Sequence, residues 1–277
     1  MLFDQIDKLI ETALREDISN GDITTDAIFD KDAKAHGKYI AKEDGVICGI
    51  DVVKRVFEIL GGEFEFTPNF KDGDKVKKGD VIAKIKGDAR TLLSGERVGL
   101  NLLQHLSGIA TATSLAVEAV SGTDTKISDT RKTTPGLRLL EKYAVKVGGG
   151  SNHRFCLADG VLIKDNHISA CGSITKAVEK AKRSVPHTVK IEVEVESLDE
   201  VREALAAGAD IIMLDNMSNE LMAEAVKIID KKAITEASGN MGQKNLFEVA
   251  KTGVDIISIG ALTHSVRAMD ISLKFKV

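Results

Sequence analysis

The sequence is poor in several residue types, and each shortage argues against a class of protein. Tryptophan is absent and aromatic residues make up 4% of the 277 residues, so a platform for stacking nucleic-acid bases is not expected. The net charge is −4 and no basic tail occurs, which argues against a general nucleic-acid or membrane-surface binder. No apolar run approaches the roughly 20 residues that a membrane span needs.

Cysteine is also scarce. The three cysteines, Cys48, Cys156 and Cys171, are scattered and form no CxxC pair. They indicate reduced thiols rather than a disulfide framework or a zinc site. The first residues lack the apolar core of a signal peptide. These features together predict a cytoplasmic protein.

What is present is a globular composition, with 43% hydrophobic and 29% charged residues. This length allows one large or two moderate domains with a full core. Up to about residue 110 the chain mixes helical spacing, alternation and glycine turns. We expect helices over 3–16 and 51–60, strands over 37–41, 45–49 and 81–85, and a long helical region over 90–120 that is interrupted near Ser107 and Gly108.

From about residue 124, short apolar strands alternate with helical patterns. The strands are expected at 126–128, 161–163, 190–195, 211–214, 233–234 and 255–259, and the helices at 137–147, 173–183, 197–207, 219–229 and 244–251. Repeated βα units predict parallel strands with right-handed crossovers. Because no GxGxxG motif follows the first strand, we favour an incomplete (β/α) barrel over a dinucleotide-binding sheet.

Polar residues follow the strands of this barrel, and barrel active sites lie at those strand ends. Five cationic side chains could form a cup for a small polyanion: Arg131, Lys132, His153, Arg154 and Lys164. Glu194 and Asp215 could hold sugar hydroxyls or a hydrated Mg²⁺. The segment Ser238, Gly239, Asn240 and the later Gly260 could let backbone N–H groups approach a phosphate. The pattern indicates a substrate with carboxylates and a phosphorylated sugar.

Plainer structural interpretations stay open for several of these residues. Arg131 and Lys132 could belong to a solvated loop. Glu192 and Glu194 share one strand face, and if they do not bind a ligand in the lumen they would pair with nearby lysines. Gly148–Gly150 is expected to be a flexible link. His167 and His264 lie near the site and could be structural or functional.

A series of motifs then points to one family. They include Asp129-Thr-Arg-Lys-Thr-Thr-Pro-Gly136, Leu162-Ile-Lys-Asp-Asn-His167, Ile191-Glu-Val-Glu194, Ile212-Met-Leu-Asp-Asn216, Glu236-Ala-Ser-Gly-Asn240 and Ser258-Ile-Gly-Ala-Leu-Thr-His264. Gly95–Asn101, Ser107–Thr111 and Gly148–Arg154 add to them. These stretches run in order through most of the chain, and in their combination the sequence resembles quinolinate phosphoribosyltransferase.

The resemblance implies an α/β fold with three parts. These are an N-terminal α/β sandwich over residues 1–110, an incomplete α/β barrel over 111–265 and a C-terminal tail over 266–277 that rejoins the sandwich. It also implies a homodimer, in some members part of a higher oligomer, in which the N-terminal domain of one subunit caps the partner's barrel.

The resemblance also implies roles for residues. Arg97 would reach the partner's site, and the carboxylates of quinolinate would be bound by Arg131, His153, Arg154 and Lys164. Lys132 would contact phosphate or diphosphate, and Glu194 and Asp215 would face the ribose and Mg²⁺, directly or through water or substrate. Lys132, Glu194 and Asp215 would be the catalytic residues. The 5-phosphate would be surrounded by Ser238, Gly239, Asn240, Gly260 and His264.

The implied reaction joins quinolinate to 5-phosphoribosyl 1-diphosphate and yields nicotinate mononucleotide, diphosphate and CO₂, a step of NAD synthesis. Three alternatives remain at this point. They are a paralogue with another substrate, such as the molybdenum-transport-associated relative, a non-catalytic binding barrel, and an unrelated sugar-phosphate isomerase or decarboxylase. Retention of the whole cationic set and the presence of Arg97 favour the quinolinate enzyme.

Overall fold

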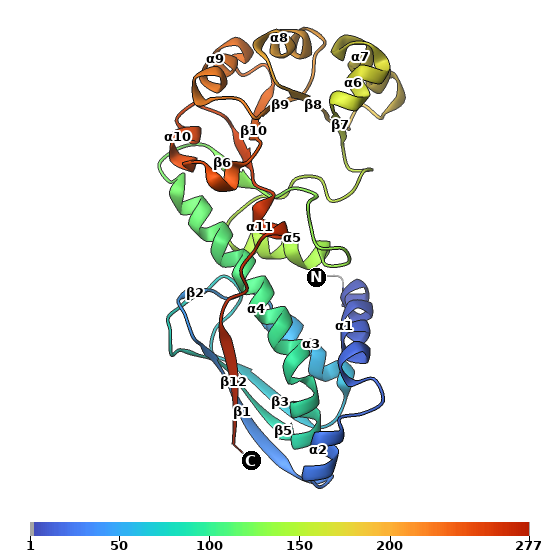
Figure 1. The fold of residues 1–277 in the computed structure, drawn as a ribbon, viewed down its shortest axis with the longest axis vertical. Coiled ribbons are helices and arrows are strands. Elements are labelled where there is room, and N and C mark those ends of the chain that lie inside the picture. The colour runs from blue at the N-terminus through green and yellow to red at the C-terminus, as the bar shows by residue number, and fades with distance from the viewer. Residues whose placement is uncertain (1–2, 277) are drawn as a thin grey trace. The chain divides into compact units, whose positions relative to one another are not determined.

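The computed structural model describes residues 3–276, which form two compact units. Unit 1 contains residues up to 114 together with 134–149 and the segment after 265, and unit 2 contains 115–133 and 150–265. Figure 1 labels most of the elements of both. Across residues 3–276, none of the helices combines the length and apolar content that crossing a membrane would require.

Unit 1 is built on a four-stranded antiparallel sheet in the order β12-β1-β5-β3. The strands are β1 (Lys34–Ala41), β3 (Phe64–Pro68), β5 (Val81–Asp88) and β12 (Ile271–Lys276). Two short strands, β2 (Gly45–Val46) and β4 (Lys75–Val76), pair separately. Along β1, exposed and buried residues alternate, as expected for a sheet with one face packed. The chain end therefore supplies an edge strand of this unit.

Helices cover the sheet of unit 1 and complete its core. They are α1 (Phe3–Ile18), α2 (Ile23–Ile28), α3 (Ile50–Leu60) and most of α4 (Ala89–Ala119). The core joins Tyr39 of β1 and Phe57 of α3 with Leu92 and Leu103 of α4, all nearly or fully buried. The expected α/β sandwich is confirmed.

Helix α4 runs for 31 residues without interruption, so the expected break at Ser107 and Gly108 is wrong. These residues serve packing within unit 1 instead. The Ser107 hydroxyl accepts the Cys48 N–H at 3.0 Å. A Cβ on Gly108 would overlap the backbone carbonyl of Arg267. Small and polar residues in the helix therefore mark a close backbone approach and not a helix end.

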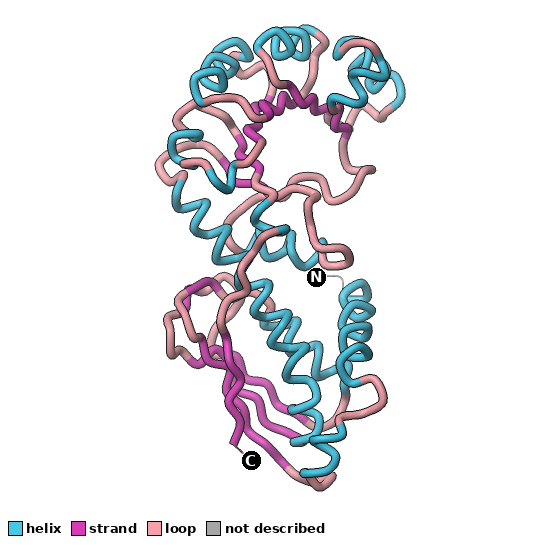
Figure 2. Tube along the Cα trace, in the orientation of Figure 1, coloured by secondary structure: helices cyan, strands magenta, loops and turns pink. Residues whose placement is uncertain are grey.

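Unit 2 is an incomplete barrel of six parallel strands in the order β6-β11-β10-β9-β8-β7. The strands are β6 (Lys126–Ser128), β7 (Val161–Ile163), β8 (Ile191–Val195), β9 (Ile211–Asp215), β10 (Ile234–Ser238) and β11 (Ile256–Ser258). Figure 2 shows these strands curling into an arc that remains open between β6 and β7. The expected incomplete barrel is confirmed.

Helices line the outside of this arc. They are α6 (Asp165–Cys171), α7 (Ile174–Ser184), α8 (Leu198–Ala206), α9 (Asn219–Ile229) and α10 (Leu246–Ala250), whereas the short α11 (Ala261–His264) follows the carboxyl end of β11. Serines 173, 197 and 218 cap α7, α8 and α9 by accepting backbone N–H groups with their side chains. In these three βα units the loop therefore ends in a serine that stabilises the start of the next helix.

Residues 134–149, which include α5 (Arg138–Val147), pack with unit 1. Gly148 ends α5, and a Cβ at this position would press against Ala110 and Thr113 of the same unit. Gly149 has a positive φ of 91°. The glycine cluster is a tightly packed turn, so the expectation of a flexible link is wrong.

Candidate active site

A cavity of about 440 Å³ opens at the carboxyl ends of the unit 2 strands. All but three of the expected site residues line it: Arg131, Lys132, His153, Arg154, Lys164, Glu194, Asp215, Ser238, Gly239 and Asn240. These residues are spread over more than 100 positions of the sequence, and the parallel sheet brings them together at one edge. Their cationic and acidic side chains share one cup.

The loop that carries His153 and Arg154 is fixed against β6. Ser151 forms a parallel bridge with Ser128, and its N–H donates to the Ile127 carbonyl at 2.8 Å. The buried carboxylate of Asp129 accepts the backbone N–H of His153 at 2.9 Å. This loop therefore extends the sheet edge and holds the side chains of His153 and Arg154 at the cavity.

Two guanidinium groups come close together in the cup. Burial lowers the pKa of Arg154, and the positive charge of Arg131 lowers it further, while Glu192 opposes the shift. Arg154 also donates from Nη1 to the carbonyl of Gly160 at 2.7 Å. Two cations held side by side before substrate binds form a site for a dianion.

Lys164, which follows β7, and Glu194 of β8 form an ion pair at the cavity. Glu194 is largely buried, whereas about half of the Lys164 side chain is exposed. The expectation that a glutamate of β8 would pair with a lysine is confirmed for Glu194. The backbone N–H of Lys164 donates to His167 Nδ1 at 3.0 Å, so in this structure His167 caps α6.

Asp215 ends β9 and is held by its neighbour. Asn216 donates from Nδ2 to Asp215 Oδ2 at 2.6 Å, and the Asn216 N–H donates to the carbonyl of Ser238 at 3.1 Å. Asn216 adopts a left-handed backbone with φ of 54°. Asn216 therefore orients the carboxylate, a role that the sequence analysis did not assign.

The turn after β10 requires glycine at position 239. Gly239 has φ of 91°, and a Cβ there would overlap the side-chain oxygen of Asn216. With 5-phosphoribosyl 1-diphosphate, the substrate that the resemblance implies, we expect Gly239→Ala to raise the KM by about tenfold or more, because about 1–2 kcal/mol of strain distorts the turn. Steady-state kinetics with each substrate varied in turn measures this effect.

Gly122→Ala is the matched control for this variant. Gly122 has φ of 82°, and open space surrounds the position of its absent Cβ. A KM that changes equally in both variants would show that the Gly239 turn has no special part in binding.

Gly260 and His264 lie beside Lys132 rather than among the lining residues. A Cβ on Gly260 would contact Lys132 Cδ at 3.0 Å and His264 Cδ2 at 3.1 Å. Thr263 donates its hydroxyl to the Lys132 carbonyl at 2.7 Å. Glycine at position 260 therefore leaves room for the side chains of Lys132 and His264.

Arg97 is exposed on α4 within unit 1.

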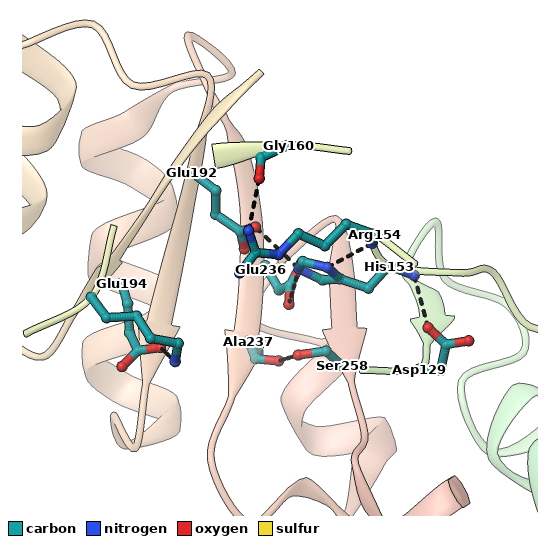
Figure 3. A network of polar contacts seen from close by, with 10 residues as sticks. Asp129, His153, Arg154, Gly160, Glu192, Glu194, Glu236, Ala237 and Ser258 are labelled. Atoms are coloured by element: carbon teal, nitrogen blue, oxygen red, sulfur yellow. Dashed lines mark hydrogen bonds and ion pairs between the residues drawn. The ribbon is translucent and has the colours of Figure 1, made fainter. Parts of the chain in front are cut away.

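Beneath the cup, His153 and Glu192 form a buried cluster with a third residue, Glu236, to which the sequence analysis gave no role (Figure 3). Glu192 of β8 and Glu236 of β10 point toward His153, whose Nε2 lies 3.1 Å from Glu192 Oε2 and 3.8 Å from Glu236 Oε1. His153 Nδ1 accepts the Arg154 N–H at 2.8 Å. Both ring nitrogens of His153 therefore face protein groups. The alternation Glu236-Ala-Ser238, which puts Glu236 on the same strand face as Ser238, was the available sequence signal.

The buried cluster should make stability depend on pH. Burial raises the pKa of Glu236 to about 7, and the charges of Glu192 and Asp129 add to the shift, while His153 and Ser258 oppose it. Between the unfolded value of 4.5 and about 7, the folded chain binds more protons than the unfolded chain. The unfolding free energy contributed by this group therefore falls as pH rises through that window.

We expect the Tm of Glu236→Gln, relative to the unsubstituted protein, to rise as pH increases from 5 to 8. Thermal unfolding at several pH values tests this. Glu248→Gln, at an exposed ion pair with Lys251, should show a flat difference. A flat difference for Glu236→Gln as well would contradict the assignment.

The fold and this cup define a class of protein. An incomplete parallel barrel with cations, acids and a tight glycine turn at its strand ends is suited to join an anionic small molecule to a phosphorylated sugar. The chain belongs to the quinolinate phosphoribosyl transferase family, because its N-terminal domain model matches residues 22–107 and its C-terminal domain model matches residues 109–274.

Relatives span the whole chain. A probable nicotinate-nucleotide pyrophosphorylase (carboxylating) of Bacillus subtilis is 49% identical over 97% of this chain and 93% of its own length. One from Methanocaldococcus jannaschii is 47% identical over 99% and 98%. The crystal structure of NadC from Streptococcus pyogenes superposes with a TM-score of 0.94 at 47% identity, covering 100% of this chain and 98% of that one.

Proposed function

We propose that this chain transfers the phosphoribosyl group of 5-phosphoribosyl 1-diphosphate to quinolinate and releases CO₂, giving nicotinate mononucleotide and diphosphate. The observation that carries this proposal is that Arg131, Arg154, Glu194 and Asp215 line the same cavity. The printed names of full-length relatives, nicotinate-nucleotide pyrophosphorylase (carboxylating), agree with it.

In this proposal the cations bind the pyridine dicarboxylate. Arg131, Arg154 and Lys164 contact its two carboxylates, with guanidinium groups suited to bidentate contact. His153 was expected to join them. In this structure its nitrogens face Glu192 and the Arg154 N–H, so a direct contact would require its ring to turn. Lys132 contacts the diphosphate, and the 238–240 turn with Gly260 and His264 surrounds the 5-phosphate.

The acids serve the transfer step. When diphosphate leaves C1 of the ribose, positive charge grows on the sugar, and the carboxylates of Asp215 and Glu194 stabilise it. The ring nitrogen of quinolinate attacks C1 and becomes cationic. Its positive charge then stabilises the electron pair that stays on the neighbouring ring carbon when the adjacent carboxylate leaves as CO₂. Because both substrates lie in one cup, positioning supplies much of the rate.

Magnesium is part of the proposal. Asp215 and Glu194 offer hard carboxylate oxygens at the cavity, and Mg²⁺ binds few carboxylates while keeping waters or phosphate oxygens. The residues present fit such an ion, held directly or through water. When bound, it would offset charge on the diphosphate.

We also place the protein in the cytoplasm, which its three free cysteines support.

The test of the activity is substrate choice. The purified protein is incubated with 5-phosphoribosyl 1-diphosphate and either quinolinate or nicotinate, and mononucleotide is quantified. We expect product from quinolinate and a kcat/KM for nicotinate at least about a hundredfold lower, because the cup would hold an unpaired cation. Equal rates with both substrates, or product from nicotinate alone, would overturn the proposal.

We further propose a homodimer in which Arg97 of one subunit completes the partner's site. Arg97→Ala and Arg131→Ala should each be inactive alone. Mixed in equal amounts and allowed to exchange subunits, they should recover about one quarter of the native activity, because half of the dimers regain one native site. Assays of the mixture over time measure this recovery. A mixture that stays inactive although heterodimers are detected would refute shared sites.

A further inference from the structure

The buried cluster of Glu192, Glu236 and His153 holds more acid than its donors can satisfy. The side chains of Glu192 and Glu236 are 5% and 3% exposed. Among the described residues, Glu192 Oε1 and Glu236 Oε1 have no hydrogen-bond partner. A buried carboxylate oxygen without a donor is destabilising, and two adjacent carboxylates repel each other. A proton on one carboxyl group relieves both problems.

The tautomer of His153 indicates that the cluster holds a proton and not a metal ion. His153 Nδ1 accepts an N–H and therefore carries a lone pair, so in the neutral ring the proton is on Nε2. That Nε2–H points at Glu192 and Glu236. The three groups lie close enough together to form a metal site. A nitrogen that carries a proton cannot ligate a metal, however, so the cluster is arranged to hold a proton.

Two cavities meet at this cluster. Glu236, His153 and Ser258 line the substrate cavity at the strand ends. Glu236, His153 and Glu192 also line a second cavity of about 390 Å³, which reaches Lys126 and Lys190 at the opposite strand ends. Glu236 thus borders both the cavity at the strand ends and the second cavity.

The proposed reaction needs a proton at the ring carbon that loses its carboxylate. When the carboxylate leaves as CO₂, the electron pair of the broken carbon–carbon bond stays on the ring carbon beside the cationic nitrogen. We propose that Glu236, held beside Glu192 beneath His153, is the catalytic acid that protonates this carbon. This inference rests on the proposed function. The new C–H bond forms from that pair and the Glu236 proton, and Glu236 is left as a carboxylate.

Solvent then restores the proton to Glu236 through the second cavity, so the cycle consumes one proton for each CO₂ released. The groups that face Glu236 set this balance. Glu192 from β8 and Asp129 after β6 favour its protonated form, whereas His153 and the Ser258 hydroxyl of β11 favour the carboxylate. Glutamate at 236 therefore has the surroundings of a proton donor that works near neutral pH.

The test separates the two halves of the reaction. In single turnovers of the full-length protein, diphosphate release and CO₂ release are timed independently. Glu236→Gln has the same shape but cannot donate a proton. We expect diphosphate release within about twofold of the unsubstituted protein. Net CO₂ release should slow at least about a hundredfold, because the carbon–carbon bond re-forms unless the ring carbon is protonated, and general acid catalysis supplies factors of this size. The mononucleotide that still bears both carboxylates should accumulate and be detectable by mass spectrometry.

A second measurement does not depend on the variant's folding. In the unsubstituted protein, the rate of CO₂ release should fall as pH rises above about 7, where Glu236 loses its proton, while diphosphate release should not follow it. Glu248→Gln should match the unsubstituted protein throughout. Rates of CO₂ and diphosphate release that change together, in the variant or across pH, would overturn the assignment. An unsubstituted protein that releases neither product would instead refute the proposed function.

Discussion

Arg131→Ala is expected to lower the affinity for quinolinate by about 10²–10³-fold while the barrel stays folded. Arg131 lines the cavity beside Arg154, and the two positive charges oppose each other until a dianion binds. Removing one partner of a buried charged contact costs about 2–5 kcal/mol, or roughly 30- to 5,000-fold in affinity, and the expected loss lies within that range. Isothermal titration calorimetry with quinolinate measures the affinity, and thermal unfolding checks the fold.

Two further variants sharpen the test of Arg131. Arg131→Lys should recover only part of the affinity, because an ammonium group cannot make the bidentate contact of a guanidinium. Arg202→Ala, which removes an exposed arginine paired with Asp199 on α8, should bind quinolinate normally. Unchanged affinity in Arg131→Ala would remove Arg131 from the substrate cup.

Asp215→Asn is expected to lower kcat by about 10²–10³-fold and to leave quinolinate affinity within about twofold. The variant keeps the size of the side chain, but it removes the negative charge that Asn216 holds at the end of β9. Losing one preorganised electrostatic contact in the transition state has effects of this size. Steady-state kinetics, with calorimetry for quinolinate, separates the two quantities.

Asp199→Asn is the matched control for Asp215, since the Asp199 side chain is 97% exposed on α8. It should leave both kcat and affinity unchanged. A kcat for Asp215→Asn close to that of the control would show that the charge at this position does not act on the developing sugar cation.

The order of the elements could be predicted from the sequence because apolar periodicity records burial. Strand β6 matched its expected bounds, and the six strands of the barrel were all found. Strand β10 was expected at 233–234 but spans Ile234–Ser238, because Glu236 and Ser238 face the lumen and break the apolar pattern. The functional strand ends are therefore the places where strand prediction from hydrophobicity fails.

Other features depend on contacts between distant segments. Strands β3 and β12 were missed, since β3 has no buried residue and the C-terminal strand gains its place only by pairing with β1. The cluster beneath the cup combines β8, β10 and the loop after residue 150. No local pattern reveals that Glu192, Glu236 and His153 meet. The cationic cup was predictable because parallel strands bring their ends to one edge.

The most direct measurement is the stoichiometry of the reaction with quinolinate labelled in the carboxylate next to the ring nitrogen. Labelled CO₂, diphosphate and nicotinate mononucleotide are quantified from the same sample with 5-phosphoribosyl 1-diphosphate and Mg²⁺. The proposed function requires the three products in equal amounts. Diphosphate release without labelled CO₂, or a mononucleotide that retains the label at the end of the reaction, would contradict it.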